Sequence, residues 1–155
     1  MRTFYDEKSV IDFGYELSSY LFENSVITLS GDLGAGKTTF TKGIGKGLDI
    51  KKIINSPTFT IVKIYQGRLP LYHFDAYRLE NHDEELGFEE MFEGGGVSVI
   101  EWAEFIGDIL PVERLEINIS IQDDNSRVFT FRPIGKQYED IVKEIDSDEN
   151  HIRHI

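Results

Sequence analysis

The chain has 155 residues, a length that predicts one domain with a single substantial core. Its 16 Lys and Arg residues against 28 Asp and Glu residues give a formal net charge of −12, which argues against unassisted binding to nucleic acid or to an anionic membrane. Cysteine is absent, which excludes disulfides, thiol nucleophiles and zinc–thiolate sites.

The first predicted element is an amphipathic helix from Ser9 to Phe22, with Ser9 as its candidate N-cap. The two acids before it, Asp6 and Glu7, are expected from composition alone to be ordinary solvated charges. This N-terminal segment contains no apolar leader, and no later run approaches the ~20 apolar residues of a membrane span. We therefore expect a soluble, cytoplasmic protein.

The strongest motif is a glycine-rich loop that follows a predicted buried strand, Val26–Ser30. Residues 31–38 match the phosphate-binding pattern G-x-x-x-x-G-K-S/T at every fixed position, and a helix is predicted for Thr39–Leu48. Glycines permit the close backbone approach that lets several N–H groups converge on a polyphosphate. Lys37 supplies a positive charge for the phosphate oxygens, and Thr38 offers a hydroxyl to Mg²⁺ at the helix N-terminus, which itself favours anions.

A basic stretch and a polar loop come next. The lysines on and just beyond the predicted helix form either a solvated face or a contact for a partner or RNA; they are Lys42, Lys46, Lys51 and Lys52. In the loop at residues 55–60, Pro57 disfavours helix for the residue before it. Phosphate-loop NTPases often carry a γ-phosphate sensor in this position, so Thr58 belongs either to a switch loop or to a simple turn.

Two β-rich runs at residues 60–65 and 69–74 flank a short glycine-containing connection and predict a hairpin. The second run ends at Asp75, and strand ends in open α/β sheets often carry ligand-binding groups. Asp75 is therefore a candidate for contacting Mg²⁺ or an attacking water, the alternative being a structural cap. His73 is expected to be a satisfied polar residue, because no second His or Cys lies at metal-ligand spacing.

The acidic stretch from residue 81 to residue 92 predicts short surface helices, closed by three glycines. The apolar run Val97–Ile100 then predicts a buried strand that delivers Glu101 to its C-terminal end, as a Walker B carboxylate is presented. Asp is the usual residue there, although Glu can also hold Mg²⁺ directly or through water. The alternative is a surface glutamate at a strand terminus. Trp102, the only tryptophan, follows directly.

The last third of the chain predicts a short helix at residues 103–110, a hairpin and a terminal helix. Residues 115–121 alternate between apolar and polar as a strand does, and a polar turn leads to a second strand at residues 127–131. From its position alone, Arg127 is a surface charge on that strand. The terminal helix is predicted for Gln137–Ile145, and residues 146–155 are expected to form a flexible tail.

These elements predict an α/β fold, a P-loop NTPase-like mixed sheet with flanking helices and antiparallel hairpins. Residues 1–145 would form a single nucleotide-binding domain. The guanine-reading N/T-K-x-D element is absent, as is an arginine-rich lid, which favours an ATPase. Three functions remain open: an ATP-hydrolysing switch that acts on a partner, a small-molecule phosphotransferase, and a nucleotide-binding module without catalysis.

Taken together, four motifs resemble the bacterial TsaE (YjeE) family. They occur in family order and spacing over nearly the whole chain: the phosphate loop with Thr39, Ser56-Pro57-Thr58-Phe59-Thr60, His73-Phe74-Asp75-Ala76-Tyr77-Arg78, and Val99-Ile100-Glu101-Trp102. The resemblance implies an ATPase that is required, with TsaB and TsaD, for making N6-threonylcarbamoyladenosine (t6A) in tRNA. It further implies that the transfer chemistry belongs to TsaD, while this protein couples ATP hydrolysis to turnover of the TsaB–TsaD complex.

The resemblance also implies roles for particular residues. The residues expected to contact ATP are Glu7, Leu33, Gly34, Ala35, Gly36, Lys37, Thr38, Thr58, Asp75, Trp102 and Arg127. Of these, Lys37 and Asp75 would act in catalysis together with Glu101, and Mg²⁺ would be held by Thr38 and Glu101. The acidity of the chain implies that tRNA is met only indirectly, through the protein partners, and self-association stays open.

Overall fold

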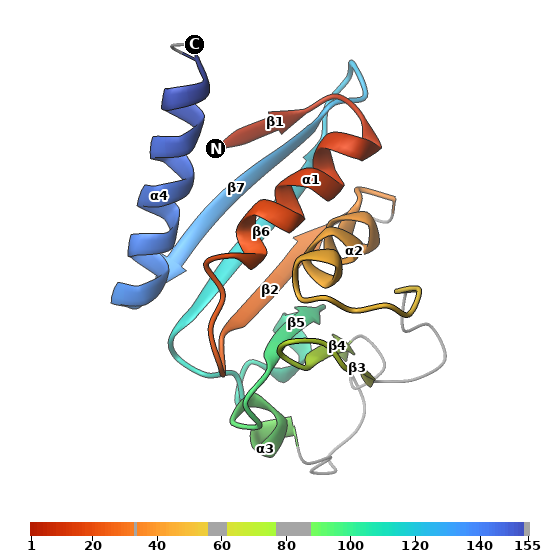
Figure 1. The fold of residues 1–155 in the computed structure, drawn as a ribbon, viewed down its shortest axis with the longest axis vertical. Coiled ribbons are helices and arrows are strands. Elements are labelled where there is room, and N and C mark those ends of the chain that lie inside the picture. The colour runs from red at the N-terminus through yellow and green to blue at the C-terminus, as the bar shows by residue number, and fades with distance from the viewer. Residues whose placement is uncertain (33, 56–61, 77–87, 154–155) are drawn as a thin grey trace.

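The computed structural model describes residues 1–32, 34–55, 62–76 and 88–153, the last seven of these by their backbone alone (Figure 1). The strands are β1 (Arg2–Phe4), β2 (Val26–Gly31), β3 (Val62–Tyr65), β4 (Leu71–Asp75), β5 (Val97–Glu101), β6 (Arg114–Ile121) and β7 (Arg127–Ile134). The helices are α1 (Glu7–Ser18), α2 (Lys37–Gly47), α3 (Phe88–Phe92), α4 (Lys136–Arg153) and the 3₁₀ helix η2 (Ala103–Ile106).

The strands form one seven-stranded mixed sheet in the order β1-β7-β6-β2-β5-β4-β3. Strand β2 pairs in parallel with both β5 and β6, and β4 pairs in parallel with β5. The outer pairs, β3–β4, β6–β7 and β1–β7, are antiparallel, so both predicted hairpins and the α/β mixed sheet are confirmed. Because parallel strands end at one edge, Gly31, Asp75 and Glu101 meet there, with Asp75 opposite Glu101 in register.

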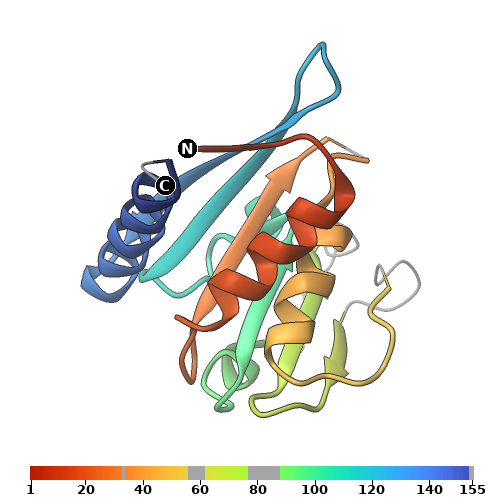
Figure 2. The ribbon, with the colours of Figure 1, turned by 45° about the horizontal axis from the view of Figure 1, so that its top comes forward.

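The core lies on both faces of the sheet. Helices α1 and α2 cross one face side by side, and their apolar side chains join those of β2, β6, β7 and α4 in the larger cluster (Figure 2). The smaller cluster lies between β4, β5, α3 and η2 and contains Phe74, Phe88 and Phe92. Burial on both faces explains why β2 and β5 are nearly continuous apolar runs in the sequence.

Glycines set the distance between α1 and α2. A β-carbon on Gly14 would lie 2.5 Å from the carbonyl oxygen of Phe40, and one on Gly43 would collide with the carbonyl of Ile11. The two helix backbones are therefore in direct contact. Gly14, which is unfavourable inside an isolated helix, is needed because this contact anchors the helix that begins at Lys37.

The N-terminus of α1 differs from the sequence prediction. The helix runs from Glu7 to Ser18, whereas the sequence predicted Ser9–Phe22, and the N-cap is Asp6 rather than Ser9. The Asp6 carboxylate accepts hydrogen bonds from the hydroxyl and the backbone N–H of Ser9, both at 2.7 Å, and these hold the pKa of Asp6 below its ordinary value. Capping by Asp6 therefore places Glu7 in the first helical turn.

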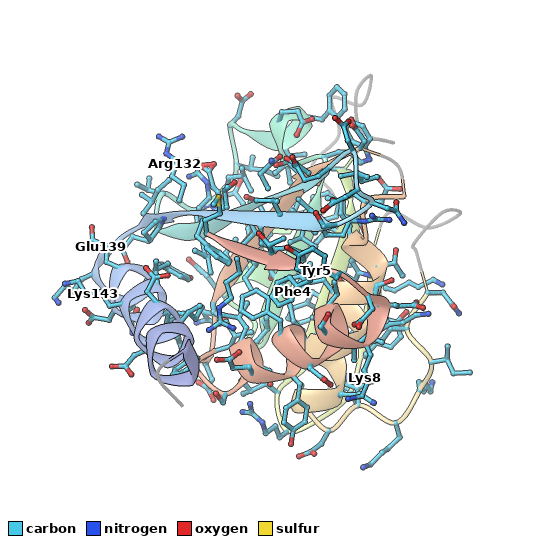
Figure 3. The ribbon with its side chains drawn as sticks, turned by 90° about the horizontal axis from the view of Figure 1, so that it is seen from above. Phe4, Tyr5, Lys8, Arg132, Glu139 and Lys143 are labelled. Carbon is cyan, nitrogen blue, oxygen red and sulfur yellow. The ribbon has the colours of Figure 1, made fainter. Side chains whose placement is uncertain are left out.

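Other boundaries also differ. The segment after Trp102 forms the short 3₁₀ helix η2 instead of a helix to residue 110. Helix α4 extends to Arg153, past the predicted end at Ile145. Exposed charged side chains such as Arg132, Glu139 and Lys143 cover the outer side of β7 and α4 (Figure 3). In the described part of the chain, no helix combines the length and the apolar character needed to span a membrane.

Tyr138 joins α4 to the central strand. Its buried hydroxyl accepts a hydrogen bond from the backbone N–H of Val26 at 2.9 Å. Burial, together with the charge of Glu113, raises the pKa of Tyr138 above its ordinary value of 10.0. The hydrogen bond closes the end of β2 that lies opposite the phosphate loop.

We expect Tyr138→Phe to lower the free energy of unfolding at neutral pH by about 1–3 kcal/mol, because the Val26 N–H loses its acceptor. Because the folded-state pKa is raised, the tyrosine contribution is complete below about pH 10 and is lost as the pH rises through the folded-state value. Urea unfolding at neutral and alkaline pH measures both effects. An identical alkaline loss of stability in wild type and Tyr138→Phe would assign that loss to other groups.

Candidate functional site

The phosphate loop connects the end of β2 with the start of α2. Gly31, Gly34 and Gly36 adopt φ angles of +145°, +83° and +109°, in the region that favours glycine. A β-carbon on Gly31 would collide with the carbonyl of Ile119, whereas Gly34 and Gly36 face open space. At Gly34 and Gly36 the loop thus presents backbone, rather than side chains, next to the N-terminus of α2, as an anion-binding site requires.

Lys37 lies beneath this loop and is 92% buried. Its ammonium group donates a hydrogen bond to the carbonyl of Gly31 at 2.9 Å and lies 3.9 Å from Oε1 of Glu101. It also lies 4.9 Å from the centre of the Trp102 ring. Trp102 has a φ of +60°, which turns the chain sharply after β5 and brings the ring over the lysine.

Glu101 is the second charged group at this edge of the sheet. Its side chain is buried, and Oε2 lies 2.7 Å from Nε2 of the fully buried His73. Asp75, half-buried, ends the neighbouring strand directly opposite Glu101. Thr38 lies in the first turn of α2 and is also half-buried. The edge therefore combines one ammonium group with two carboxylates next to the phosphate loop.

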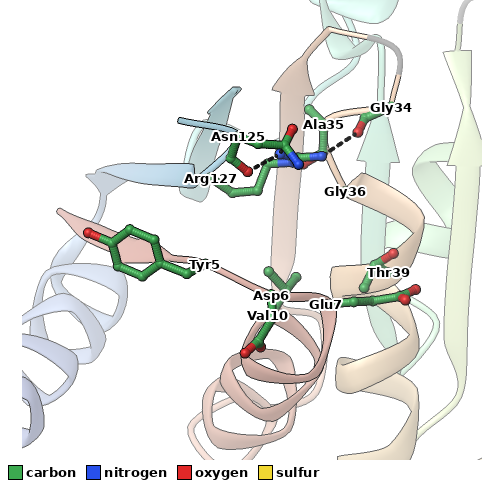
Figure 4. Close-up of a pocket in the computed structure, with 10 residues that line it drawn as sticks. All are labelled: Tyr5, Asp6, Glu7, Val10, Gly34, Ala35, Gly36, Thr39, Asn125 and Arg127. Carbon is green, nitrogen blue, oxygen red and sulfur yellow. Dashed lines mark hydrogen bonds between the residues drawn. The ribbon is translucent and has the colours of Figure 1, made fainter. Parts of the chain in front are cut away.

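A cavity of about 340 Å³ opens on the other side of the loop (Figure 4). It lies between the N-terminus of α1, the phosphate loop and the turn between β6 and β7. Its lining residues are Tyr5, Asp6, Glu7, Val10, Gly34, Ala35, Gly36, Thr39, Asn125 and Arg127. Glu7 and Arg127, far apart in the sequence, thus share one cavity with the glycines of the loop.

Arg127 fastens the phosphate loop to the β6–β7 hairpin. Its guanidinium donates to the carbonyl of Ala35 at 3.1 Å and to that of Gly34 at 3.4 Å. It also donates to the backbone and side-chain oxygens of Asn125 at 2.6 and 3.2 Å (Figure 4). The expectation of a plain surface charge was wrong, because the hairpin folds back and turns this side chain onto the loop.

The phosphate-loop motif predicts nucleotide binding, and on that prediction Arg127→Ala should weaken ADP binding by about tenfold, because the loop loses hydrogen bonds from a charged donor that hold two of its carbonyl groups in place. Arg127→Lys should recover little, since an ammonium group cannot reproduce the planar fork of donors. Isothermal titration calorimetry measures the affinities. The matched control is Arg132→Ala on the same strand, whose side chain is 77% exposed. Equal ADP affinities in the Arg127 and Arg132 variants would contradict the prediction.

The structure brings together most of the predicted site residues in two adjoining groups. Lys37, Glu101 and Trp102 are in contact, with Asp75 beside Glu101, and the cavity joins Glu7 and Arg127 to the loop. Leu33 and Thr58 lie outside the described residues, as do Tyr77 and Arg78.

Several residues at the site had no site role predicted from the sequence, among them Asp6, Val10 and Thr39 in the cavity lining. Tyr5 and Asn125 line the cavity, and His73 contacts Glu101. The available signal for His73 was its position two residues before Asp75, because alternate residues of a strand face the same side. No comparable local pattern marks Tyr5 or Asn125, which reach the cavity through tertiary packing.

Comparison with known proteins identifies the family. Residues 4–129 match the profile of the family described as "Threonylcarbamoyl adenosine biosynthesis protein TsaE". The chain is 53% identical to the TsaE protein of Bacillus subtilis (strain 168), covering 81% of this chain and 80% of the relative. It is 40% identical to TsaE of Nostoc sp. (strain PCC 7120), covering 88% of both chains. A crystal structure of YdiB from Bacillus subtilis superimposes with a TM-score of 0.84 at 40% identity, covering 96% of this chain and 94% of the other. The chain therefore belongs to the TsaE family.

Proposed function

We propose that this protein is a Mg²⁺-dependent ATPase that acts in the biosynthesis of t6A in tRNA. Relatives that match most of the chain are named as tRNA threonylcarbamoyladenosine biosynthesis proteins. The observation that carries the ATPase assignment is the contact between Lys37 and Glu101 directly behind the phosphate loop. A buried cation and carboxylate at that position supply the charges that bind a polyphosphate and its counterion.

The shape of the site fits a nucleotide. Gly34 and Gly36, with positive φ angles and open space in front of them, leave the loop free for phosphate oxygens. The cavity between Glu7, Asn125 and Arg127 adjoins the loop and gives room for the remainder of a nucleotide. Ten different residues from three segments of the chain line this cavity, so a bound nucleotide would hold these segments together.

The donor set also fits Mg²⁺. Among the described residues, no cluster of three or more His, Cys, Asp or Glu side chains could hold a metal by itself. Mg²⁺ typically uses one or two protein oxygen ligands and takes the others from substrate phosphates and water, which matches Thr38 and Glu101. When bound there, Mg²⁺ would neutralise negative charge that develops on the phosphate oxygens.

Different residues of this chain would have different roles in hydrolysis. Lys37 would move from the carbonyl of Gly31 to the β and γ phosphate oxygens, exchanging one hydrogen bond for stronger ones to charged acceptors. Asp75, which ends β4 beside Glu101, would orient the attacking water near the γ-phosphate. The backbone N–H groups of the loop and of the first turn of α2 would stabilise the transferred group.

We further propose that ATP hydrolysis drives turnover of a TsaB–TsaD complex, which carries out the transfer chemistry. The net charge of −12 supports contact with protein partners rather than direct binding to tRNA. A phosphotransferase, the alternative function, would need an acceptor molecule. ATP turnover with and without candidate acceptors separates the two, because an ATPase consumes ATP without any acceptor.

The test of the pathway is the t6A content of total tRNA, measured by mass spectrometry in cells depleted of this protein. We expect t6A to fall on depletion and to be restored by the wild-type chain but not by Glu101→Ala. Unchanged t6A after depletion would refute the role in this modification while leaving nucleotide binding open to direct measurement.

A further inference from the structure

His73 is a buried polar residue whose position calls for an explanation. It lies on β4 opposite Val99, and its side chain has no exposed surface. Nε2 lies 2.7 Å from Oε2 of Glu101, whereas Nδ1 has no hydrogen-bond partner among the described residues. A buried imidazole nitrogen without a hydrogen-bond partner costs stability, so its presence here calls for a functional explanation.

The contact indicates which nitrogen carries the proton. A proton on Nδ1 alone would leave the lone pair of Nε2 facing a carboxylate oxygen, which is repulsive. A proton on Nε2 instead lets the ring donate a hydrogen bond to Oε2 across the 2.7 Å contact.

The two oxygens of Glu101 are therefore used differently. Oε2 is held by His73 on the side of β4, while Oε1 faces Lys37 and the phosphate loop at 3.9 Å from the ammonium group. Glutamate has one more rotatable bond than the aspartate that usually occupies this position in phosphate-loop NTPases. The hydrogen bond from His73 restricts this added freedom, because it fixes the plane of the carboxylate.

We propose that His73 is a positioning residue that holds Glu101 by Oε2 so that Oε1 is presented to the metal-bound phosphates. This inference rests on the proposed Mg²⁺–nucleotide function of the site and adds to it the residue that orients the metal ligand. Hydrogen bonds to metal-binding carboxylates fix their orientation, and removing such a partner typically costs about 10–100-fold in metal affinity or activity.

Three variants of the full chain separate positioning from simple space filling. His73→Phe keeps a ring of similar size but has no donor. His73→Gln places an amide nitrogen close to the position of Nε2 and should rescue the contact. Ser98→Ala is the matched control, because Ser98 is equally buried on the neighbouring strand β5 and its hydroxyl has no hydrogen-bond partner among the described residues.

The primary measurement is ADP binding by calorimetry at increasing Mg²⁺ concentrations, followed in parallel by Trp102 fluorescence. Mg²⁺ is expected to increase the affinity for ADP. We expect His73→Phe to raise about tenfold the Mg²⁺ concentration that gives half of this increase, while the ADP affinity without Mg²⁺ stays unchanged. His73→Gln should restore most of the Mg²⁺ response, and Ser98→Ala should match wild type. A Mg²⁺ response that is the same in His73→Phe and wild type, or equal impairment in the Phe and Gln variants, would overturn the proposal.

A second measurement needs no substitution. Nitrogen-15 NMR of the wild-type imidazole reports which ring nitrogen is protonated, and we expect the proton on Nε2. A ring protonated on Nδ1 but not on Nε2 would overturn the inference even if His73→Phe failed to fold. If wild-type ADP binding showed no response to Mg²⁺, the proposed function itself would fail. If the wild type responded to Mg²⁺ and His73→Phe responded equally, only the role of His73 would fail.

Discussion

Replacing Lys37 by alanine is expected to weaken ATP binding by about 10–100-fold, because charge-assisted hydrogen bonds contribute about 1.5–3 kcal/mol each. The ammonium group of Lys37 already lies within hydrogen-bond distance of the Gly31 carbonyl in the phosphate loop. The variant also leaves the buried Glu101 without its neighbouring positive charge, which adds repulsion toward a polyphosphate. Calorimetric titration with ATP and ADP measures the loss.

The matched control is Lys46→Ala. Lys46 lies in the last turn of the same helix and is exposed, so this variant makes the same change in net charge away from the loop. We expect its ATP affinity to stay close to that of wild type, because exposed charges more than a Debye length from a ligand are largely screened. If both lysine variants lost affinity equally, the effect would come from net charge rather than from a contact at the phosphates.

Replacing Glu101 by alanine is expected to produce a different pattern. Mg²⁺-dependent hydrolysis should fall by about 100-fold or more, equivalent to about 3 kcal/mol of lost transition-state stabilisation. Mg²⁺-free ADP affinity should be retained, since the backbone groups and Lys37 that are proposed to bind the phosphates are still present. Steady-state ATP turnover over a range of Mg²⁺ concentrations, combined with ADP titrations without metal, measures both quantities.

Glu104→Ala provides the comparison for the Glu101 variant. Glu104 is exposed on η2, three residues further along the chain, and its removal should leave hydrolysis unchanged. The division of roles between Lys37 and Glu101 would be contradicted if both alanine variants lost ATP affinity equally. A Glu101 variant that hydrolysed ATP normally would remove the carboxylate from the proposed mechanism.

Local sequence patterns predicted those parts of the site that are formed by residues close together in the sequence. The phosphate loop could be predicted because its glycines, Lys37 and the adjoining strand and helix lie within one short segment. The delivery of Glu101 to a strand end followed from a continuous apolar run, and both hairpins followed from short polar turns. In each case the signal and the structure that it specifies span only a few residues.

Helix boundaries were predicted less well. Ser9 and Asp6 are both acceptable N-caps by residue type, and only the packed position of α1 shows that Asp6 has this role. Gly14 is by residue type unfavourable inside a helix. Glycine is required at this position because the backbone of Gly14 packs against the carbonyl of Phe40 on the neighbouring helix α2. Helix α4 likewise continues beyond Ile145, into a segment where composition alone suggested a tail.

What the sequence by itself determined was the position of the candidate groups: a loop of the phosphate-binding pattern with Lys37, and carboxylates at the ends of two strands. What only the tertiary structure decided was which distant side chains meet those groups. Arg127 reaches Ala35 because the β6–β7 hairpin lies beside β2, and His73 reaches Glu101 because β4 pairs with β5 in that register. The physical reason is that strand order and register arise from burial over the whole sheet, which no short stretch of sequence encodes.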